Sequence, residues 1–237
     1  GSRGGSGATT LAINLAAALA AGGRRAVLVD MDLYQGHVTS YLKIKTKQPS
    51  AMTALAGLSN VGELKRHLPD LLAPYQENLV VLPGALAQDG RIPALTDAHT
   101  DVLLDALLGG DRRVVVDMGL GRHESHAPIF DRADDLLLCV RPERVALAAA
   151  RHRLEMLRTS LFPSTRLHVV LMDFYGGVKL PADSVSQFLG QAPAMMIHTN
   201  AAEMTTAVNK SQPLVTVAPR ADISRHIVRL ARQLGDS

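Results

Sequence analysis

The chain has 237 residues, of which 47% are hydrophobic, 20% charged and 3% aromatic, and its formal net charge is +3. This apolar fraction excludes a disordered protein, and the weak charge without a concentrated basic stripe argues against strong nucleic-acid binding. The single cysteine excludes an internal disulfide and favours a reducing compartment. No apolar run approaches the roughly 18 residues that cross a bilayer. We therefore expect a globular protein of the cytoplasm.

Short apolar runs alternate with helical patterns along the whole chain. A helix is predicted at residues 8–21, because strong helix formers there are followed by two glycines. Further helices are predicted at 100–108 and 144–158, and the stretch 43–74 reads as a helical excursion. Strands are predicted at 25–30, 79–82, 113–117, 135–140, 167–172, 194–198 and 214–217. This alternation predicts an α/β fold, a mostly parallel doubly wound sheet with helices on both faces, in a single domain over 1–237.

Two of the predicted helices carry a clear apolar stripe. In residues 144–158 one face holds Val145, Ala149, His152 and Met156. Near the C-terminus the stripe consists of Ile223, Ile227, Leu230 and Leu234. Both stripes have the spacing of a helix face that packs on a sheet.

A glycine-rich loop, G-S-R-G-G-S-G-A-T-T, leads directly into the first helix. Closely spaced glycines let backbone N–H groups surround phosphate oxygens, and the start of a helix adds partial positive charge. Thr9 lies where a phosphate loop places its magnesium ligand, but Ala8 replaces the lysine that reaches the β- and γ-phosphates. Arg3 is the nearest cation. The alternative reading is a flexible turn that runs into a helix.

Carboxylates follow two of the predicted strands. Asp30 and Asp32 come at the end of the strand at 25–30, and Asp117 ends the run Val114–Val116. In a parallel sheet these strand ends meet at one edge, so the three side chains could hold magnesium or orient an attacking water. Taken alone, each could also be a solvated carboxylate at the end of a strand.

Together these segments resemble the MinD/ParA superfamily. R-G-G-S-G-A-T-T is similar to the deviant phosphate loop of this superfamily, and most of all to the loop of the CpaE/TadZ proteins of tight-adherence pilus assembly. V-D-x-D-L-x-x-G-x-V resembles the segment after the second strand in CpaE-like proteins. The resemblance implies ATP and Mg2+ as ligands. It implies that Asp32 positions the hydrolytic water and that Arg3 reaches the phosphates of a partner subunit. Nucleotide contacts are implied for Gly4, Gly5, Ser6, Gly7, Ala8, Thr9 and Thr10, and metal contacts for Thr9, Asp30 and Asp117.

The resemblance also implies a site for the base. Asp173 stands where relatives have an asparagine that bonds adenine, and Pro213 lies in a segment, 207–219, that resembles the one bordering the base. An aspartate accepts hydrogen bonds but cannot donate them as an amide does, so the preference between adenine and guanine stays open. The residues after Asp117 also depart from the pattern of the superfamily.

Three functions are compatible with these features. The first is an ATP-binding, homodimeric positional scaffold for pilus assembly or secretion machinery, with weak or absent hydrolysis, that engages a secretion ATPase. It would be recruited to a cell pole or the inner membrane face, with only weak or indirect membrane contact. The second is an active ParA/MinD-type ATPase that cycles on DNA or membrane. The third is a degenerate domain that dimerises without nucleotide.

The glycine loop also leads to an expectation about the sheet. A phosphate loop follows a strand, and here the loop begins at the first residue. We expect that the first, central strand is absent from this chain, that a large apolar gap marks its place, and that a receiver-like domain lies further upstream.

Overall fold

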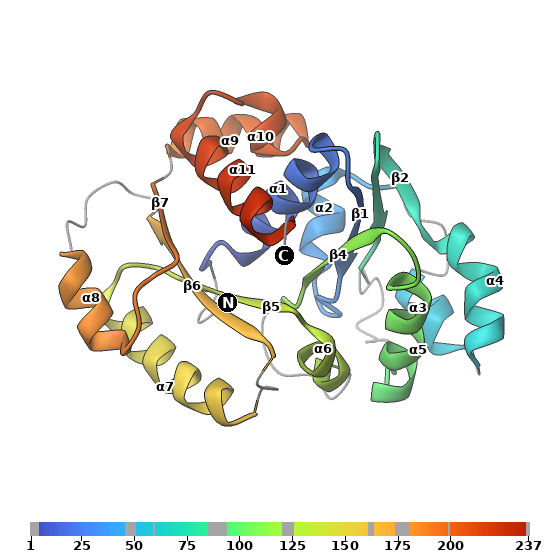
Figure 1. The fold of residues 1–237 in the computed structure, drawn as a ribbon. Helices are drawn as coiled ribbons and strands as arrows, with labels where there is room; N and C mark the ends of the chain where they lie inside the picture. Colours follow the sequence, from blue (N-terminus) through green and yellow to red (C-terminus); the bar gives the residue numbers. More distant parts are fainter. Residues whose placement is uncertain are drawn as a thin grey trace.

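A computed structural model describes residues 5–45, 51–58, 60–84, 94–119, 126–160, 164–173, 181–198 and 200–235. Figure 1 shows strands at the centre with helices around them. The strands are β1 (Arg25–Asp30), β2 (Ala73–Gln76), β3 (Leu79–Leu82), β4 (Arg112–Asp117), β5 (Asp135–Val140), β6 (Arg166–Asp173) and β7 (Met195–His198). The helices are α1 (Ala8–Ala21), α2 (His37–Leu42), α3 (Ala51–Ala56), α4 (Val61–Leu71), α5 (Asp97–Leu107), α6 (Ala127–Arg132), α7 (Arg144–Ser160), α8 (Ala182–Leu189), α9 (Ala201–Lys210), α10 (Leu214–Val217) and α11 (Asp222–Gly235).

The described strands form two sheets, with the orders β2-β3-β1-β4 and β5-β6-β7. All pairings are parallel except that of β2 with β3. β2, which the sequence patterns did not predict, is a short edge strand that contains Pro74. The predicted α/β class with a mostly parallel sheet is confirmed.

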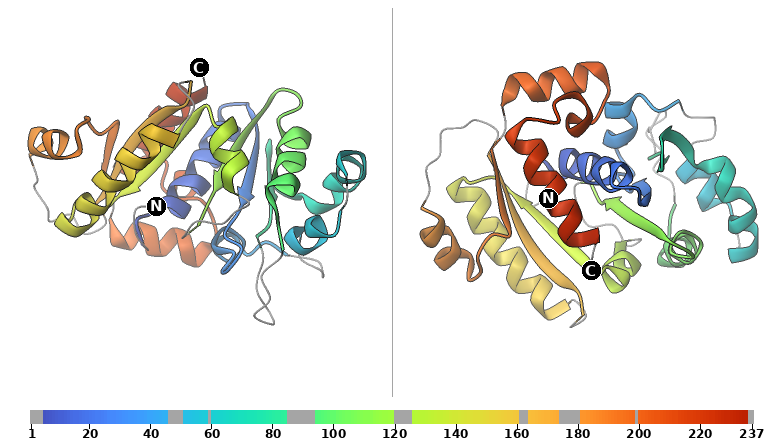
Figure 2. Two further views of the ribbon diagram at one scale, coloured as in Figure 1. Left: turned by 90° about the horizontal axis from the view of Figure 1, so that it is seen from below. Right: turned by 45° about the horizontal axis from the view of Figure 1, so that its top comes forward.

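Alternate strand residues pack on opposite helical layers, as the period of a strand requires. On one face Leu28, Cys139 and Met172 join a core with α1 and α11. On the other face Val29 packs with α3, α4 and α5, while Leu171 packs with α7 and α8. Two views turned from the first show these layers (Figure 2). Helices therefore cover both faces, as predicted.

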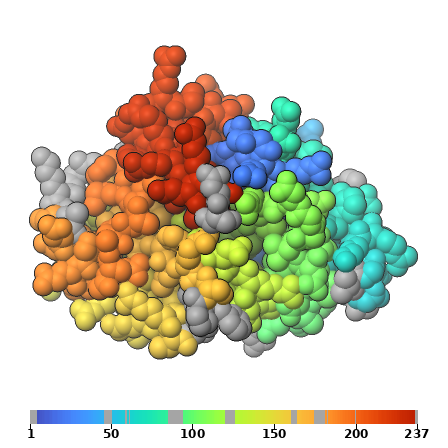
Figure 3. Space-filling model, in the orientation of Figure 1, coloured from blue at the N-terminus to red at the C-terminus, as the bar shows by residue number. Residues whose placement is uncertain are grey.

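Helices α1 and α11 lie against each other. The C-terminal stripe Ile223, Ile227 and Leu230 is buried in the core that holds α1, whereas Arg225, Arg229 and Arg232 are exposed on the opposite face. In the space-filling view the red C-terminal segment borders the blue N-terminal helix (Figure 3). The packing role predicted for this stripe is confirmed. Among the described residues, no helix is long and apolar enough to cross a membrane.

A cleft separates the two sheets between β4 and β5. β4 pairs with β1 and β5 pairs with β6, so each of these two strands has one edge without a partner strand among the described residues. The cavity between them measures about 1140 Å³, and both strands and α1 line it, through residues such as Leu15, Val115 and Leu137. A large cavity lined by apolar residues of both strands is therefore present between β4 and β5.

Two expectations about local structure were wrong. Residues 214–217 form a short helix, not a strand, because the Pro213 carbonyl accepts the N–H groups of Thr216 and Val217 at 3.0 and 3.1 Å. Helix α7 is present, but Val145 is 68% and Met156 42% exposed, and the core takes the opposite face, with Ala146, Leu147, Ala150 and Leu154. Both faces of α7 have apolar helical spacing, so the pattern alone could not decide which one packs inward.

Candidate functional site

The phosphate-type loop enters α1 through two glycines in the left-handed conformation. The φ angles are +73° at Gly5 and +86° at Gly7, values that side-chain-bearing residues rarely adopt. Gly7 caps α1 and its carbonyl accepts the Leu11 N–H at 2.9 Å, and no side chain of the described residues caps the helix. The first N–H groups of α1 are thus available to an anion. Gly4 and Arg3 lie outside the described residues, so the bridging role of Arg3 stays a prediction.

The first turn of α1 carries the remaining loop residues. Ser6 is buried, and Gly7, Ala8, Thr9 and Thr10 are half-buried. The Thr10 carbonyl accepts the Asn14 side-chain amide at 2.8 Å, and the oxygen of the same amide accepts the Val215 N–H at 2.9 Å. Asn14 therefore ties the first turn of α1 to α10, next to the buried Pro213. Sequence reasoning missed this residue.

Asp30 and Asp117 end adjacent strands in register, and they are only 0% and 2% exposed. Burial, together with the neighbouring Asp117 carboxylate, raises the pKa of Asp30 to about 7. Burial also raises the pKa of Asp117, although the hydroxyl of Thr9 hydrogen-bonds this carboxyl group and lowers the value in part. The structure thus brings together Thr9, Asp30 and Asp117, the three residues proposed to surround a metal.

Asp32 lies beside these two carboxylates and is 4% exposed. Its Oδ1 accepts the N–H groups of Tyr34 and Gln35, both at 3.2 Å. Its Oδ2 lies 2.7 Å from His37 Nδ1. A Cβ at Gly119 would come within 2.7 Å of the Asp32 Cβ, so only a glycine allows this approach. His37 is a second residue that sequence reasoning missed, although it lies within the quoted V-D-x-D-L-x-x-G-x-V segment.

The donor set fits a magnesium ion. Asp117 Oδ2 is buried without a hydrogen-bond partner among the described residues, and the paired carboxylates carry raised pKa values that a cation would reverse. In the described part of the chain no three His, Cys, Asp or Glu side chains group closely enough to hold a metal by themselves. Mg2+ commonly takes only one or two carboxylates, with water and substrate phosphates completing its shell.

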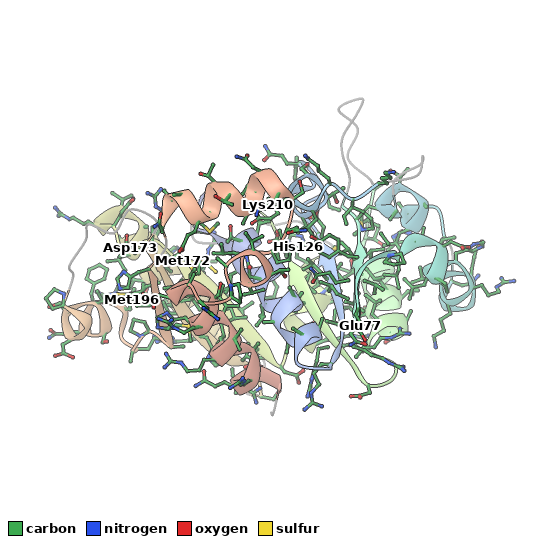
Figure 4. All side chains as sticks on the ribbon, turned by 90° about the horizontal axis from the view of Figure 1, so that it is seen from above. Glu77, His126, Met172, Asp173, Met196 and Lys210 are labelled. Carbon is green, nitrogen blue, oxygen red and sulfur yellow. The ribbon has the colours of Figure 1, made fainter. Side chains whose placement is uncertain are left out.

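The predicted base-reading residue lies beneath a histidine. Asp173 is 3% exposed at the carboxyl end of β6, and its Oδ2 lies 3.1 Å from Nδ1 of His198 at the end of β7. The His198 side chain is 57% exposed. Figure 4 shows Asp173 close to Met172, on the side of the molecule formed by β6, β7 and α8. The exposed group of this pair is therefore His198, which sequence reasoning also missed.

Comparison with known proteins gives both a partial family match and a shared fold. Residues 1–87 match the family model described as an AAA domain. An uncharacterized ATP-binding protein of Methanocaldococcus jannaschii is 28% identical over 148 residues, which make up 62% of this chain and 53% of that protein. The chain thus spans about half the length of this curated relative.

Two solved structures resemble the chain over nearly its full length. A ParA family ATPase from Chlorobium tepidum is 20% identical, with a TM-score of 0.84 over 98% of this chain and 95% of that one. The septum site-determining protein MinD of Pyrococcus horikoshii, complexed with Mg-ADP, is also 20% identical, with a TM-score of 0.79 over 98% and 92% of the two chains.

These findings define the fold of the chain. The chain has the ParA/MinD-type P-loop α/β fold, with its glycine loop before α1 and its carboxylates at the ends of β1 and β4. Residues 1–87 match the AAA-domain family model, and membership of the MinD/ParA superfamily stays a prediction. The CpaE/TadZ branch of that superfamily stays a prediction.

Proposed function

We propose that this chain binds ATP with Mg2+ and acts as a dimerising positional scaffold with slow hydrolysis. The observation that carries the proposal is Ala8, which replaces the phosphate-binding lysine in a loop that otherwise keeps its left-handed glycines and uncapped helix. The loop can still bind phosphate through backbone N–H groups. Loss of one cation removes a stabiliser of transition-state charge, typically worth a few kcal/mol.

Mg2+ would be held by Thr9, Asp30 and Asp117, and it would neutralise charge on the nucleotide phosphates. The buried Asp117 Oδ2 and the raised pKa of Asp30 support this assignment. The Mg-ADP complex of the Pyrococcus horikoshii relative adds support. Gly4, Gly5, Ser6, Gly7, Ala8, Thr9 and Thr10 would contact the phosphates, largely through the backbone.

The base would lie between His198 and the segment at Pro213. A carboxylate accepts only, so the contact with Asp173 places the proton of His198 on Nδ1 and leaves Nε2 of the neutral ring as an acceptor. An acceptor suits the 6-amino group of adenine rather than the 6-oxygen of guanine. Competition between ATP and GTP tests this preference: His198→Ala should lose it, while His67→Ala, on the exposed face of α4, should keep it.

The scaffold would work as a homodimer that Arg3 bridges to the partner's phosphates, and that dimer would engage pilus or secretion proteins such as a secretion ATPase. The likeness to positioning ATPases of the ParA and MinD type supports a role in placement. The single domain over 1–237 belongs to the same proposal.

Light scattering after size exclusion, with and without ATP and Mg2+, tests this function. We expect a monomer without nucleotide and a dimer with it, and Arg3→Ala should bind nucleotide yet remain monomeric. A dimer that forms equally without nucleotide, with no binding heat by calorimetry, would select the degenerate domain instead.

An active cycling ATPase is the second candidate, because Thr9 and Asp32 are retained and Asp32 lies beside Asp117. Rapid steady-state turnover, abolished in Asp32→Ala and accompanied by sedimentation with nonspecific DNA or anionic liposomes, would favour it over the scaffold.

A further inference from the structure

Tyr34 presents an exposed aromatic ring at the edge of the carboxylate site. The residue is 55% exposed, and its N–H donates to Asp32 Oδ1 at 3.2 Å. The preceding Leu33 is buried, and the Gly36 N–H closes the turn on the Asp32 carbonyl at 3.1 Å. An aromatic ring on a fixed turn loses little conformational freedom when a partner covers it. Tyr34 therefore has the properties of a residue that anchors a protein–protein contact.

The segment that carries Tyr34 suits contact with a second copy of this chain. Residues 33–38, here called the rim, read Leu-Tyr-Gln-Gly-His-Val and contain no lysine, arginine, aspartate or glutamate. Tyr34 and Gln35 are exposed, and His37 is half-exposed. Two identical surfaces face each other in a two-fold dimer, so a strongly charged surface would repel its own copy. The composition of the rim avoids this repulsion.

The other exposed large hydrophobic residues of the described ranges lie in places less suited to self-association. They are Leu108, Val145, Met156, Phe188 and Val208. Helix α7 carries two of them beside exposed arginines, and one of these, Arg151, lies 5.6 Å from the ring centroid of Phe188. Leu108 lines the cleft, and Val208 lies two residues before the exposed Lys210. Two copies that met through α7 would bring like charges together, which opposes association.

A short series of buried groups connects the rim to the phosphate loop. The Thr9 hydroxyl at the start of α1 bonds Asp117, and the charges of Asp117 and Asp32 act on each other. Asp32 Oδ1 in turn accepts the N–H groups of Tyr34 and Gln35, both at 3.2 Å. The rim is therefore fixed by the same carboxylate that belongs to the candidate nucleotide site. A dimer formed through the rim would cover this site in each copy.

We propose that the rim is a self-complementary surface through which two copies of this chain bind each other, and that Tyr34 is its anchor. The inference rests on the proposed function, which requires a homodimer, and it names the surface that the dimer uses. The ring of Tyr34 packs against the other copy and excludes water from the contact. The turn that carries the ring is already formed in the single chain, so little order has to be gained on association.

Sedimentation velocity with ATP and Mg2+ measures the dimer Kd of each variant. Truncation of an anchoring aromatic residue typically weakens association about 30-fold or more, so Tyr34→Ala should raise the dimer Kd by at least that factor. Tyr34→Phe keeps the ring and should stay within about threefold of the parent. Phe188→Ala removes an exposed ring of α8 and is the matched control, with the parent Kd expected. Binding of a fluorescent ATP analogue to dilute, monomeric protein should stay within about threefold in all variants.

A spin label on Gln35→Cys reports on the rim while Tyr34 is kept. The native Cys139 is only 2% exposed, so the label reacts at position 35. The label should lose mobility when ATP and Mg2+ are added, and it should stay mobile when Tyr34→Ala is also present. Tyr34→Ala at the parent dimer Kd, or a label that stays mobile in the dimer, would overturn the proposal and leave the scaffold function intact. A parent chain that binds nucleotide but forms no dimer would overturn both.

Discussion

The Thr39 hydroxyl donates a hydrogen bond to Asp30 Oδ2 at 3.2 Å, and the Thr39 N–H donates to the same oxygen at 3.2 Å. The hydroxyl also accepts the Gly84 N–H at 2.9 Å. A Cβ at Gly84 would come within 2.6 Å of Asp30 Cγ, so a glycine is needed at this contact. Thr39 of α2 and Gly84 in the loop after β3 thus hold the Asp30 carboxyl group in its buried position. These hydrogen bonds offset only part of the cost of burying its charge, because its pKa is still raised to about 7.

Thr39→Val should destabilise the protein. Valine has nearly the same shape but no hydroxyl, so the buried Gly84 N–H loses its acceptor and Asp30 loses a donor. An unsatisfied buried group costs about 1–3 kcal/mol. Urea unfolding checks this loss, and Thr206→Val is the control, because that hydroxyl lies on an exposed helix face and bonds the Ala202 carbonyl. Equal stability of the two variants would show that the Thr39 hydroxyl does not hold Asp30.

A second ion cluster predicts a pH dependence at the opposite end of the strands. Burial opposes ionisation of Asp135, but hydrogen bonds from Arg166, at 2.7 and 2.8 Å, and from His168, at 2.7 Å, leave its pKa below the usual value. An acid with a lowered folded pKa stabilises the protein above its unfolded pKa and loses that contribution as the pH falls through the folded pKa.

Asp135→Asn should therefore lower the free energy of unfolding at pH 7 by about 1 kcal/mol, a value reduced for the solvent exposure of Arg166. The difference from the parent should shrink as the pH falls below the usual carboxyl pKa and through the lowered pKa of the folded Asp135, where the parent carboxylate becomes protonated. Urea titrations at pH 7 and pH 3.5 measure both values. Asp70→Asn, on the exposed face of α4, should be neutral at both. A loss that is the same at both pH values would rule out the charge as its cause.

Much of the fold could be predicted because the strands are buried on both faces. Such strands read as unbroken apolar runs, and β1 and β5 match the predicted ranges residue for residue. The residues 214–217 read the same way, yet the preceding proline directs them into a helical turn. The apolar pattern therefore predicted the wrong element here, because Pro213, whose ring fixes its own φ angle, determined the conformation of the residues that follow.

The carboxylates at the strand ends could be predicted, but their histidine partners could not. Asp30, Asp32 and Asp117 follow from the rule that carboxyl ends of parallel strands share an edge. His37 and His198 contact Asp32 and Asp173 through side-chain placement that depends on tertiary packing. The sequence singled out Asp32 and Asp173 as the functional side chains. In the structure both are buried, and the side chains exposed to solvent are those of His37 and His198.

Ala8→Lys should strengthen nucleotide binding. Ala8 is half-buried in the first turn of α1, so a longer side chain can extend from the loop toward the phosphates. A hydrogen bond to a charged group is worth about 1.5–3 kcal/mol, which corresponds to a roughly 10- to 100-fold lower Kd for ATP. Calorimetry with ATP and Mg2+ measures the change. Ala8→Leu adds bulk without charge and should not tighten binding; the same gain in both variants would show that packing, not charge, is responsible.

The cleft between β4 and β5 should accept one parallel strand. Within the described ranges both facing edges carry backbone groups without strand partners, and the walls include Val115, Leu137 and Leu15. Six residues of valine, isoleucine and alanine placed before Gly1 could pair with both edges and bury apolar side chains on both faces. A gain of about 3 kcal/mol would raise Tm by roughly 6–12 °C in a protein of this size. A glycine–serine extension of equal length should leave Tm unchanged, and an equal rise with both extensions would mean that the apolar strand does not fill the cleft.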